Sequence, residues 1–223
     1  MILQHLLMMD YCERISDGFW AEPINALTNA AFVIAALLLF RLLGQQRRRI
    51  PWNVYFLSLL IAGVGLGSFL WHTLAAPWSE LADKLPIFAF MFVYLQSYLA
   101  GVLGLSRLWV SVWLVFFLLL NAAVMLWLPA DLLNGSVMYL PALLALLLIT
   151  LASVMLRLGG AKTMLAVAGL FCVSVTFRSM DQLLCDLFPL GTHFAWHLLN
   201  AMILYWLMRA LIGATQKAPK KSA

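Results

Sequence analysis

Seven long apolar runs constrain this chain more than any other feature of its sequence. A helix that crosses a membrane needs about 20 mostly apolar residues, and the runs are about that long. They show no alternation of apolar and polar residues, which argues against the strands of a membrane barrel. Lipid offers the backbone no hydrogen bonds, so helices are favoured. We therefore predict an all-α integral membrane protein, a seven-transmembrane helix bundle with spans over residues 23–42, 52–74, 84–105, 108–128, 137–157, 162–181 and 193–213.

The composition agrees with this class of protein. Of the 223 residues, 65% are hydrophobic and 10% are charged, whereas soluble domains are about 45–50% apolar and about 25% charged. The net charge of +5 could suggest nucleic acid, but basic residues on membrane proteins usually mark cytoplasmic loops. We predict no nucleic-acid partner, and the sequence does not indicate an oligomeric state. The first nine residues lack the features of a signal peptide.

The charged residues are sorted between the two ends of the predicted spans. Seven spans place the termini on opposite sides; the C-terminal side collects eleven of the 14 Lys and Arg, and all nine acids lie on or near the N-terminal side. The positive-inside rule then places the N-terminus outside and the C-terminus in the cytoplasm. We predict an acidic exoplasmic segment over 1–22, a membrane domain over 23–213 and a disordered basic tail over 214–223, in a bacterial inner membrane.

Three histidines have the spacing of a catalytic zinc site. His193 and His197 are four residues apart, which places them on one face of the last span. His72 ends the second span on the same side of the membrane, so the three can meet at one depth. Three protein ligands leave the fourth position of zinc open for water. Two alternatives are histidines that only hydrogen-bond between helices and a haem site.

Two further side chains favour the hydrolytic interpretation. Ser68 lies four residues before His72 and shares its helix face, and Asp83 lies at the start of the predicted third span. Ionisable residues in or beside a span are costly and usually functional. Haem ligation needs no adjacent Ser and Asp, whereas hydrolysis at zinc can use both. We therefore predict that Ser68 and Asp83 are catalytic.

Other polar residues leave alternatives open. Arg178, Asp181 and Asn200 either support the histidines or form plain hydrogen bonds between helices. Cys12 and Cys185 lie on the same side of the membrane, where a disulfide would tie the N-terminal segment to the loop before the last span in an oxidising compartment.

Four stretches together resemble the alkaline ceramidase family, within the wider group of seven-span hydrolases and receptors that includes the adiponectin receptors. They read "DYCE…AEPINALTN", "GSFLWHTL…ELADKLP", "FRSMDQLLC" and "HFAWH". The resemblance covers nearly the whole chain. It implies that His72, His193 and His197 hold zinc, that Asp83 contacts the water at the metal, and that Ser68 lies close to the metal and the reacting carbonyl.

The resemblance also implies a calcium site in the acidic N-terminal segment. The positions carried over are Asp10, Tyr11 through its carbonyl, Glu13, Ile15 and Glu22. Ile15 stands where the family usually has Asn, and the segment looks about two residues shorter, so Asp17 would supply a replacement oxygen. Calcium takes about 6–8 oxygen ligands. The alternative is a solvated acidic rim balanced by Arg14.

The predicted function is zinc-dependent hydrolysis of ceramide or a related N-acyl lipid to a fatty acid and an amine, with the site near the exoplasmic face. The partner is a membrane lipid, and the cofactors are zinc and calcium. One alternative is a lipid receptor or binding protein with a structural zinc, which would more often carry a large soluble domain or a long tail. Another is a hydrolase of the same chemistry that acts on a different acyl lipid.

Overall fold

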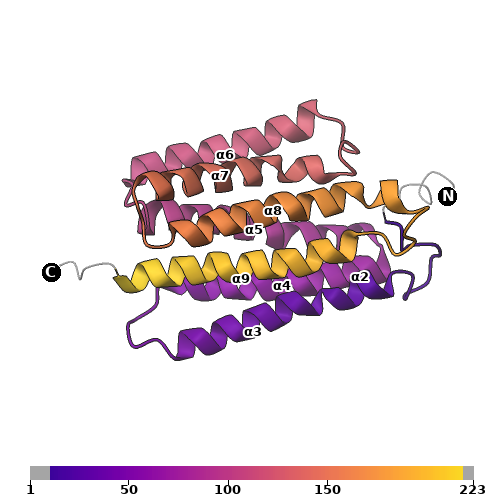
Figure 1. Ribbon diagram of the computed structural model, residues 1–223, viewed down its shortest axis with the longest axis horizontal. Helices are drawn as coiled ribbons and strands as arrows, with labels where there is room; N and C mark the ends of the chain where they lie inside the picture. The colour runs from indigo at the N-terminus through magenta and orange to yellow at the C-terminus, as the bar shows by residue number, and fades with distance from the viewer. Residues whose placement is uncertain (1–10, 218–223) are drawn as a thin grey trace.

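The computed structural model describes residues 11–217, which form a bundle of long helices and contain no strand. Figure 1 shows the long helices running side by side along the length of the molecule. The elements in chain order are α2 (Pro23–Thr28), α3 (Ala30–Gly44), α4 (Trp52–Leu74), α5 (Pro77–Gly101), α6 (Arg107–Trp127), η1 (Ser136–Tyr139), α7 (Leu140–Met155), α8 (Ala161–Met180), η2 (Gln182–Leu184) and α9 (His193–Lys217).

Six stretches of the described chain are long and apolar enough to cross a membrane. They cover α2 with α3, α4, α6, η1 with α7, α8 and most of α9. The prediction of an all-α membrane protein is confirmed as a helical chain with these six stretches. The helix α5 is not among the six, so the count of seven spans and the orientation of the termini stay predictions.

The predicted bounds of the third span were wrong. It was placed at 84–105, whereas α5 runs from Pro77 to Gly101. Proline is favoured in the first turn of a helix because the missing N–H would have no partner there. The Ser79 hydroxyl also accepts the backbone N–H of Ala76, which caps this end of the helix. Most of the residues between the second and third predicted spans (75–83) therefore form the first turns of α5, and Asp83 lies inside the helix.

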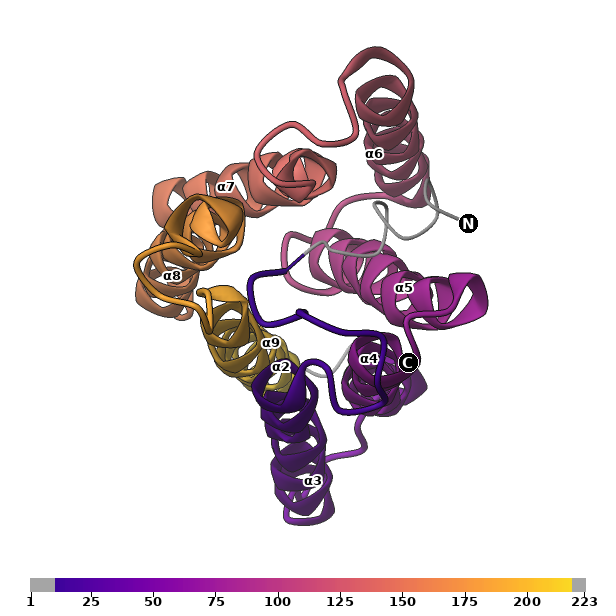
Figure 2. The same cartoon turned by 90° about the vertical axis from the view of Figure 1, so that its right-hand side faces the viewer.

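The packing brings the end of α4 close to the start of α9. Figure 2 looks at the bundle from this end, with α4, α5, α2 and α9 around its centre and α6 at the edge. The helix α4 packs against α3, α5 and α9, and α9 also packs against α3 and α8. Residues 11–22 of the N-terminal segment cross this end of the bundle (Figure 2). Side chains that are at most 1% exposed fill the centre, among them Leu39, Leu57, Ile61, Met208 and Leu211.

Candidate metal centre

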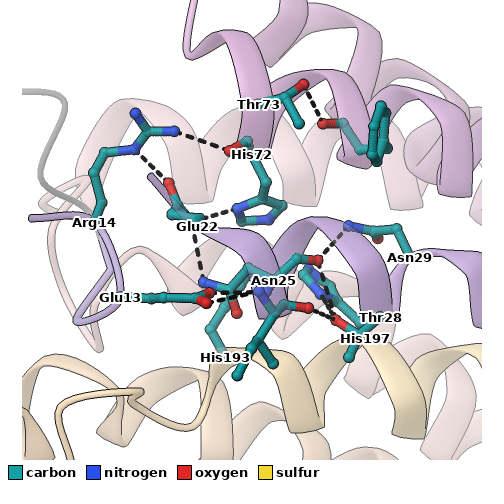
Figure 3. Close-up of polar contacts among 12 residues, drawn as sticks. Glu13, Arg14, Glu22, Asn25, Thr28, Asn29, His72, Thr73, His193 and His197 are labelled. Carbon is teal, nitrogen blue, oxygen red and sulfur yellow. Dashed lines mark hydrogen bonds and ion pairs between the residues drawn. The ribbon is translucent and has the colours of Figure 1, made fainter. Parts of the chain in front are cut away.

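The three predicted histidines meet in the interior, at the end of the bundle covered by the N-terminal segment. One nitrogen of each of His72, His193 and His197 lies within 4.8 Å of those of the other two, and each side chain is at most 2% exposed. Figure 3 shows His72 reaching in from α4 and the other two from the start of α9. A nitrogen spacing of this size suits three ligands around one ion.

Hydrogen bonds orient two of the three rings. Nδ1 of His72 lies 2.5 Å from Oε2 of Glu22, and Nδ1 of His197 lies 3.0 Å from the Thr28 hydroxyl. The Thr28 hydroxyl donates its own proton to the carbonyl of Ile24, at 2.8 Å. Both rings therefore donate from Nδ1–H, which leaves Nε2 with a lone pair. Oxygen acceptors behind metal-ligating histidines commonly set the tautomer and orientation in this way.

The third histidine, His193, is held through its backbone N–H, which donates a hydrogen bond to the Asp181 carboxylate. Its Nδ1 is buried and has no hydrogen-bond partner among the described residues. The ring packs against that of Tyr11, with the ring centroids 3.9 Å apart and the planes tilted by 31°. A buried ring nitrogen without a partner is costly unless something binds it. Two rings with free Nε2 atoms and a third held beside them fit a metal ion that prefers nitrogen ligands, such as zinc.

Ser68 and Asp83 border the same centre. They line a cavity of about 50 Å³ together with His193 and His197. Ser68 is 4% exposed, and its side chain lies close to the Asp83 carboxyl group at this cavity. The two residues come from neighbouring helices, α4 and α5. The structure thus brings both predicted catalytic side chains to the cavity at the histidines.

Close contact between α4 and α5 at Gly67 makes this pairing possible. A Cβ atom added at Gly67 would lie 2.0 Å from the Ala82 carbonyl oxygen and 3.0 Å from the Asp83 backbone nitrogen. No side chain fits in that space. Small residues that let two membrane helices approach are a common device, and here the device places Ser68 beside Asp83.

We expect Gly67→Ala to disrupt the site. Overpacking of this kind costs about 1–3 kcal/mol, and separating α4 from α5 would pull Ser68 away from Asp83. The measurement is the melting temperature in detergent. Gly63→Ala is the matched control on the same helix, since its Cβ would meet Pro86 at 3.5 Å, an ordinary contact. Equal melting temperatures for the two variants would contradict this account of Gly67.

Glu13 caps a helix. Its carboxylate accepts the backbone N–H groups of Ile24 and Asn25, at 2.6 and 2.8 Å, which satisfies two donors at the start of α2. Burial raises the pKa of the Glu13 carboxyl, although these two hydrogen bonds oppose the rise. The alternative of a solvated acidic rim is therefore wrong for Glu13, which is 7% exposed.

Glu22 links the N-terminal segment to the metal centre. Besides His72, it contacts the Arg14 side chain and accepts a hydrogen bond from Asn25 at 3.0 Å. Burial alone would raise the pKa of the Glu22 carboxyl, but the hydrogen bond from His72 and the charge of Arg14 outweigh it and lower that pKa. This role was missed in the sequence, where Glu22 was assigned to calcium alone.

The remaining predicted calcium ligands are spread out. Ile15 and Asp17 are exposed, the Tyr11 carbonyl accepts the backbone N–H of Arg14 at 3.1 Å, and Asp10 lies outside the described residues. Within residues 11–217, the three histidines are the one group of His, Cys, Asp or Glu side chains close enough to share an ion. Calcium binding stays a prediction.

Asp181 joins three segments at the start of α9. Its carboxylate accepts the backbone N–H groups of His193 and Thr192, at 2.9 and 2.5 Å, and that of Cys12, at 3.0 Å. Gly191 has φ +64, and a Cβ there would lie 2.1 Å from Asp181 Oδ1. The choice that the sequence left open for Asp181 is thus decided in favour of support for the histidines.

A disulfide ties down the same region. Cys12 and Cys185 are bonded to each other, which joins the N-terminal segment to the loop before α9. Tyr11, next to Cys12, is 7% exposed and packs on the rings of His72 and His193. The disulfide and the Asp181 hydrogen bonds therefore hold Tyr11 over the three histidines. Sequence spacing does not reveal that the Tyr11 ring, rather than only its carbonyl, belongs to the site.

Helices apolar enough to cross a membrane, with three buried histidines beside a Ser–Asp pair, define a membrane protein with a candidate metal site. The family model described as Ceramidase matches residues 8–222. The chain therefore belongs to the ceramidase family. A search of the curated proteins finds no match.

Proposed function

We propose that this protein is a zinc-dependent hydrolase that cleaves the amide bond of ceramide or a related N-acyl lipid. The family match suggests ceramide hydrolysis. The observation that carries the rest is the set of three buried histidines, two of them oriented by Glu22 and Thr28, beside Ser68 and Asp83. His72, His193 and His197 would hold the zinc. When bound by three histidines, zinc acidifies water and polarises a carbonyl group.

Asp83 is the proposed general base and acid. It accepts a proton from the attacking water while the water oxygen bonds to the carbonyl carbon. The carbon–nitrogen bond then breaks, and Asp83 passes the proton to the leaving nitrogen. The products are a fatty acid and an amine. Ser68 donates a hydrogen bond to the carbonyl oxygen as that oxygen gains negative charge, a contribution whose loss costs on the order of 2.7–4 kcal/mol.

An apolar cavity beside the site suits the hydrocarbon chain of such a lipid. The cavity measures about 100 Å³ and is lined almost entirely by apolar side chains. It shares Phe32, Val64, Ile87, Tyr139 and Trp196 with the cavity at the metal centre. A chain that lies there would leave the amide group beside Asp83 and the histidines.

The test is a joint measurement of metal and turnover on the purified protein in detergent. Bound zinc is measured by elemental analysis, and fatty-acid release by mass spectrometry from ceramide, N-acyl amino acids and acyl esters. Zinc with amide cleavage supports the proposal. Zinc with cleavage of esters alone favours the hydrolase of different substrate, and zinc with no cleavage favours the lipid receptor with a structural zinc. Absence of zinc contradicts the metal centre.

Calcium binding by the N-terminal segment is a second part of the proposal. Asp17 is the most suitable position to test because Glu13 and Glu22 also make the structural contacts described above. We expect calcium to raise the melting temperature of the wild type, with about 2.7 kcal/mol of stabilisation at a concentration of 100 times Kd. Asp17→Asn should reduce this shift, and Asp131→Asn, an exposed acid elsewhere, should not. A wild type without any shift would contradict the site.

We also propose that the metal centre lies near the exoplasmic face and that the C-terminus is cytoplasmic, as the charge distribution indicates. A Ser222→Cys variant tests this in intact bacterial cells with a membrane-impermeant thiol reagent. Cys172 is free and exposed, so the variant carries Cys172→Ser as well. We expect labelling only after the cells are lysed. Labelling of the introduced cysteine from outside would reverse the orientation.

A further inference from the structure

Two apolar cavities adjoin each other in the bundle. The inner cavity is the one that borders the metal centre. The outer cavity measures about 270 Å³ and lies between α5, α6 and α7. On α5, Ile87 lines the inner cavity at its metal end, and Leu95 lines both cavities. Leu95 is eight residues beyond Ile87, which is about 12 Å of helix, so the outer cavity meets α5 farther from the histidines than the inner cavity does.

Four side chains form the partition between the cavities, because they line both. Phe117 comes from α6, and the other three come from α5 and α7. Phe117 has the largest side chain of the four, and it is 3% exposed. Its ring stacks on that of Phe88 of α5, with the centroids 6.2 Å apart. The complete set is Leu95, Phe117, Ala145 and Ile149.

The position of Phe117 is unusual for its helix. Figure 2 shows α6 at the edge of the bundle, next to α5 and α7. Of the 21 residues of α6, only Val110 and Phe117 are buried. Phe117 is thus the one ring that this helix inserts between its neighbours.

The wall formed by α7 explains why space remains on both sides of the Phe117 ring. Ala142 lines the inner cavity, Ala152 lines the outer one, and Ala145 lines both. Ala142 and Ala145 are three residues apart, so they share a face of α7. These alanines, set among larger side chains of α7 such as Leu144 and Leu146, leave room on both sides of the Phe117 ring.

We propose that Phe117 sets the longest acyl chain that the protein accepts. The chain of the lipid extends from the metal centre through the inner cavity, and its end meets the Phe117 ring. The outer cavity becomes part of the chain site only when that ring is removed. This inference rests on the proposed function, since it names the residue that limits the substrate of the same site.

The experiment compares chain-length preference in Phe117→Ala and the wild type. The substrates are two N-acyl lipids with saturated chains, a short one that the wild type cleaves and one about four methylene groups longer. A single methylene in an apolar pocket changes kcat/KM by roughly 10–200-fold. We therefore expect the ratio of kcat/KM for the long chain to that for the short chain to rise about tenfold or more in Phe117→Ala. Phe117→Trp should lower the ratio.

Phe116→Ala is the matched control. Phe116 is the neighbour of Phe117 on α6 and lines the outer cavity but not the inner one, so its removal leaves the partition in place and the ratio unchanged. Zinc content and melting temperature establish that each variant is folded, and Phe117→Leu replaces Phe117→Ala if the latter is not. A folded variant with an unchanged ratio overturns the proposal.

A second measurement separates this inference from the proposed function. Free saturated fatty acids of the same two chain lengths are added to wild type and variants, and the rise in melting temperature is recorded. We expect the longer acid to stabilise Phe117→Ala more than the wild type, relative to the shorter acid. This result would support the role of Phe117 even if no amide were cleaved. Equal relative shifts, or no shift by either acid, overturn it.

Discussion

Replacing His193 with alanine is expected to remove the metal from this protein and its hydrolytic activity with it. Bound zinc should fall from about one ion per chain to near zero, because two remaining histidines do not make a three-ligand site. His193 is the most informative ligand to remove, since its Nδ1 has no hydrogen-bond partner in the described chain. Loss of His72 would instead leave the Glu22 carboxylate buried without its ring partner.

The melting temperature provides a measurement that does not depend on activity. A chelator should lower it in the wild type, since an ion that binds only the folded state stabilises that state, and should leave His193→Ala unchanged. His5→Ala is the matched control, because His5 is the fourth histidine of the chain and has no part in the proposed site. If His193→Ala kept its zinc and its response to the chelator, the three-histidine centre would be the wrong assignment.

Asp83→Asn is expected to lower kcat by about 10²–10⁴-fold while the zinc content stays as in the wild type. The amide has the shape of the carboxylate, but it cannot accept the proton of the attacking water, and positioned proton transfer contributes a factor of that size. The measurement pairs kcat on the best N-acyl lipid with elemental analysis of zinc. Retention of zinc separates a lost base from a lost metal site.

Glu80→Gln is the matched control for this substitution. Glu80 lies on α5, lines the same cavity and forms an ion pair with Lys84. The ion pair is close to half exposed, so its loss should cost little stability. We expect Glu80→Gln to keep most of the wild-type kcat. If Asp83→Asn and Glu80→Gln had equal effects, or if Asp83→Asn were fully active, another group would have to move the proton.

The two substitutions together distinguish an enzyme from a binding protein. A lipid receptor with a structural zinc would lose stability in His193→Ala, yet Asp83→Asn would change nothing that can be measured as turnover. A hydrolase loses turnover in both variants and loses zinc in only one. The pair of results therefore decides between the two classes of function.

Much of the membrane architecture could be predicted from local sequence. Continuous apolar runs set the helices because an unpaired backbone group in lipid is costly, and the predicted span at 52–74 has the bounds of α4. The third span shows where this reasoning fails. Hydrophobicity alone excluded the polar first turns of α5, whereas Pro77 and the capping Ser79 begin the helix seven residues earlier.

The sequence by itself determined which residue types could bind a metal and on which side of the bundle they lie. The i and i+4 spacing of His193 and His197 follows from helix geometry, and the place of His72 follows from the direction of the spans. Only the tertiary structure decided what holds these rings. Glu22 and His72 are 50 residues apart, and Thr28 and His197 are 169 apart. Such contacts carry no local periodicity, because they depend on how α2, α4 and α9 pack and on where the N-terminal segment crosses them.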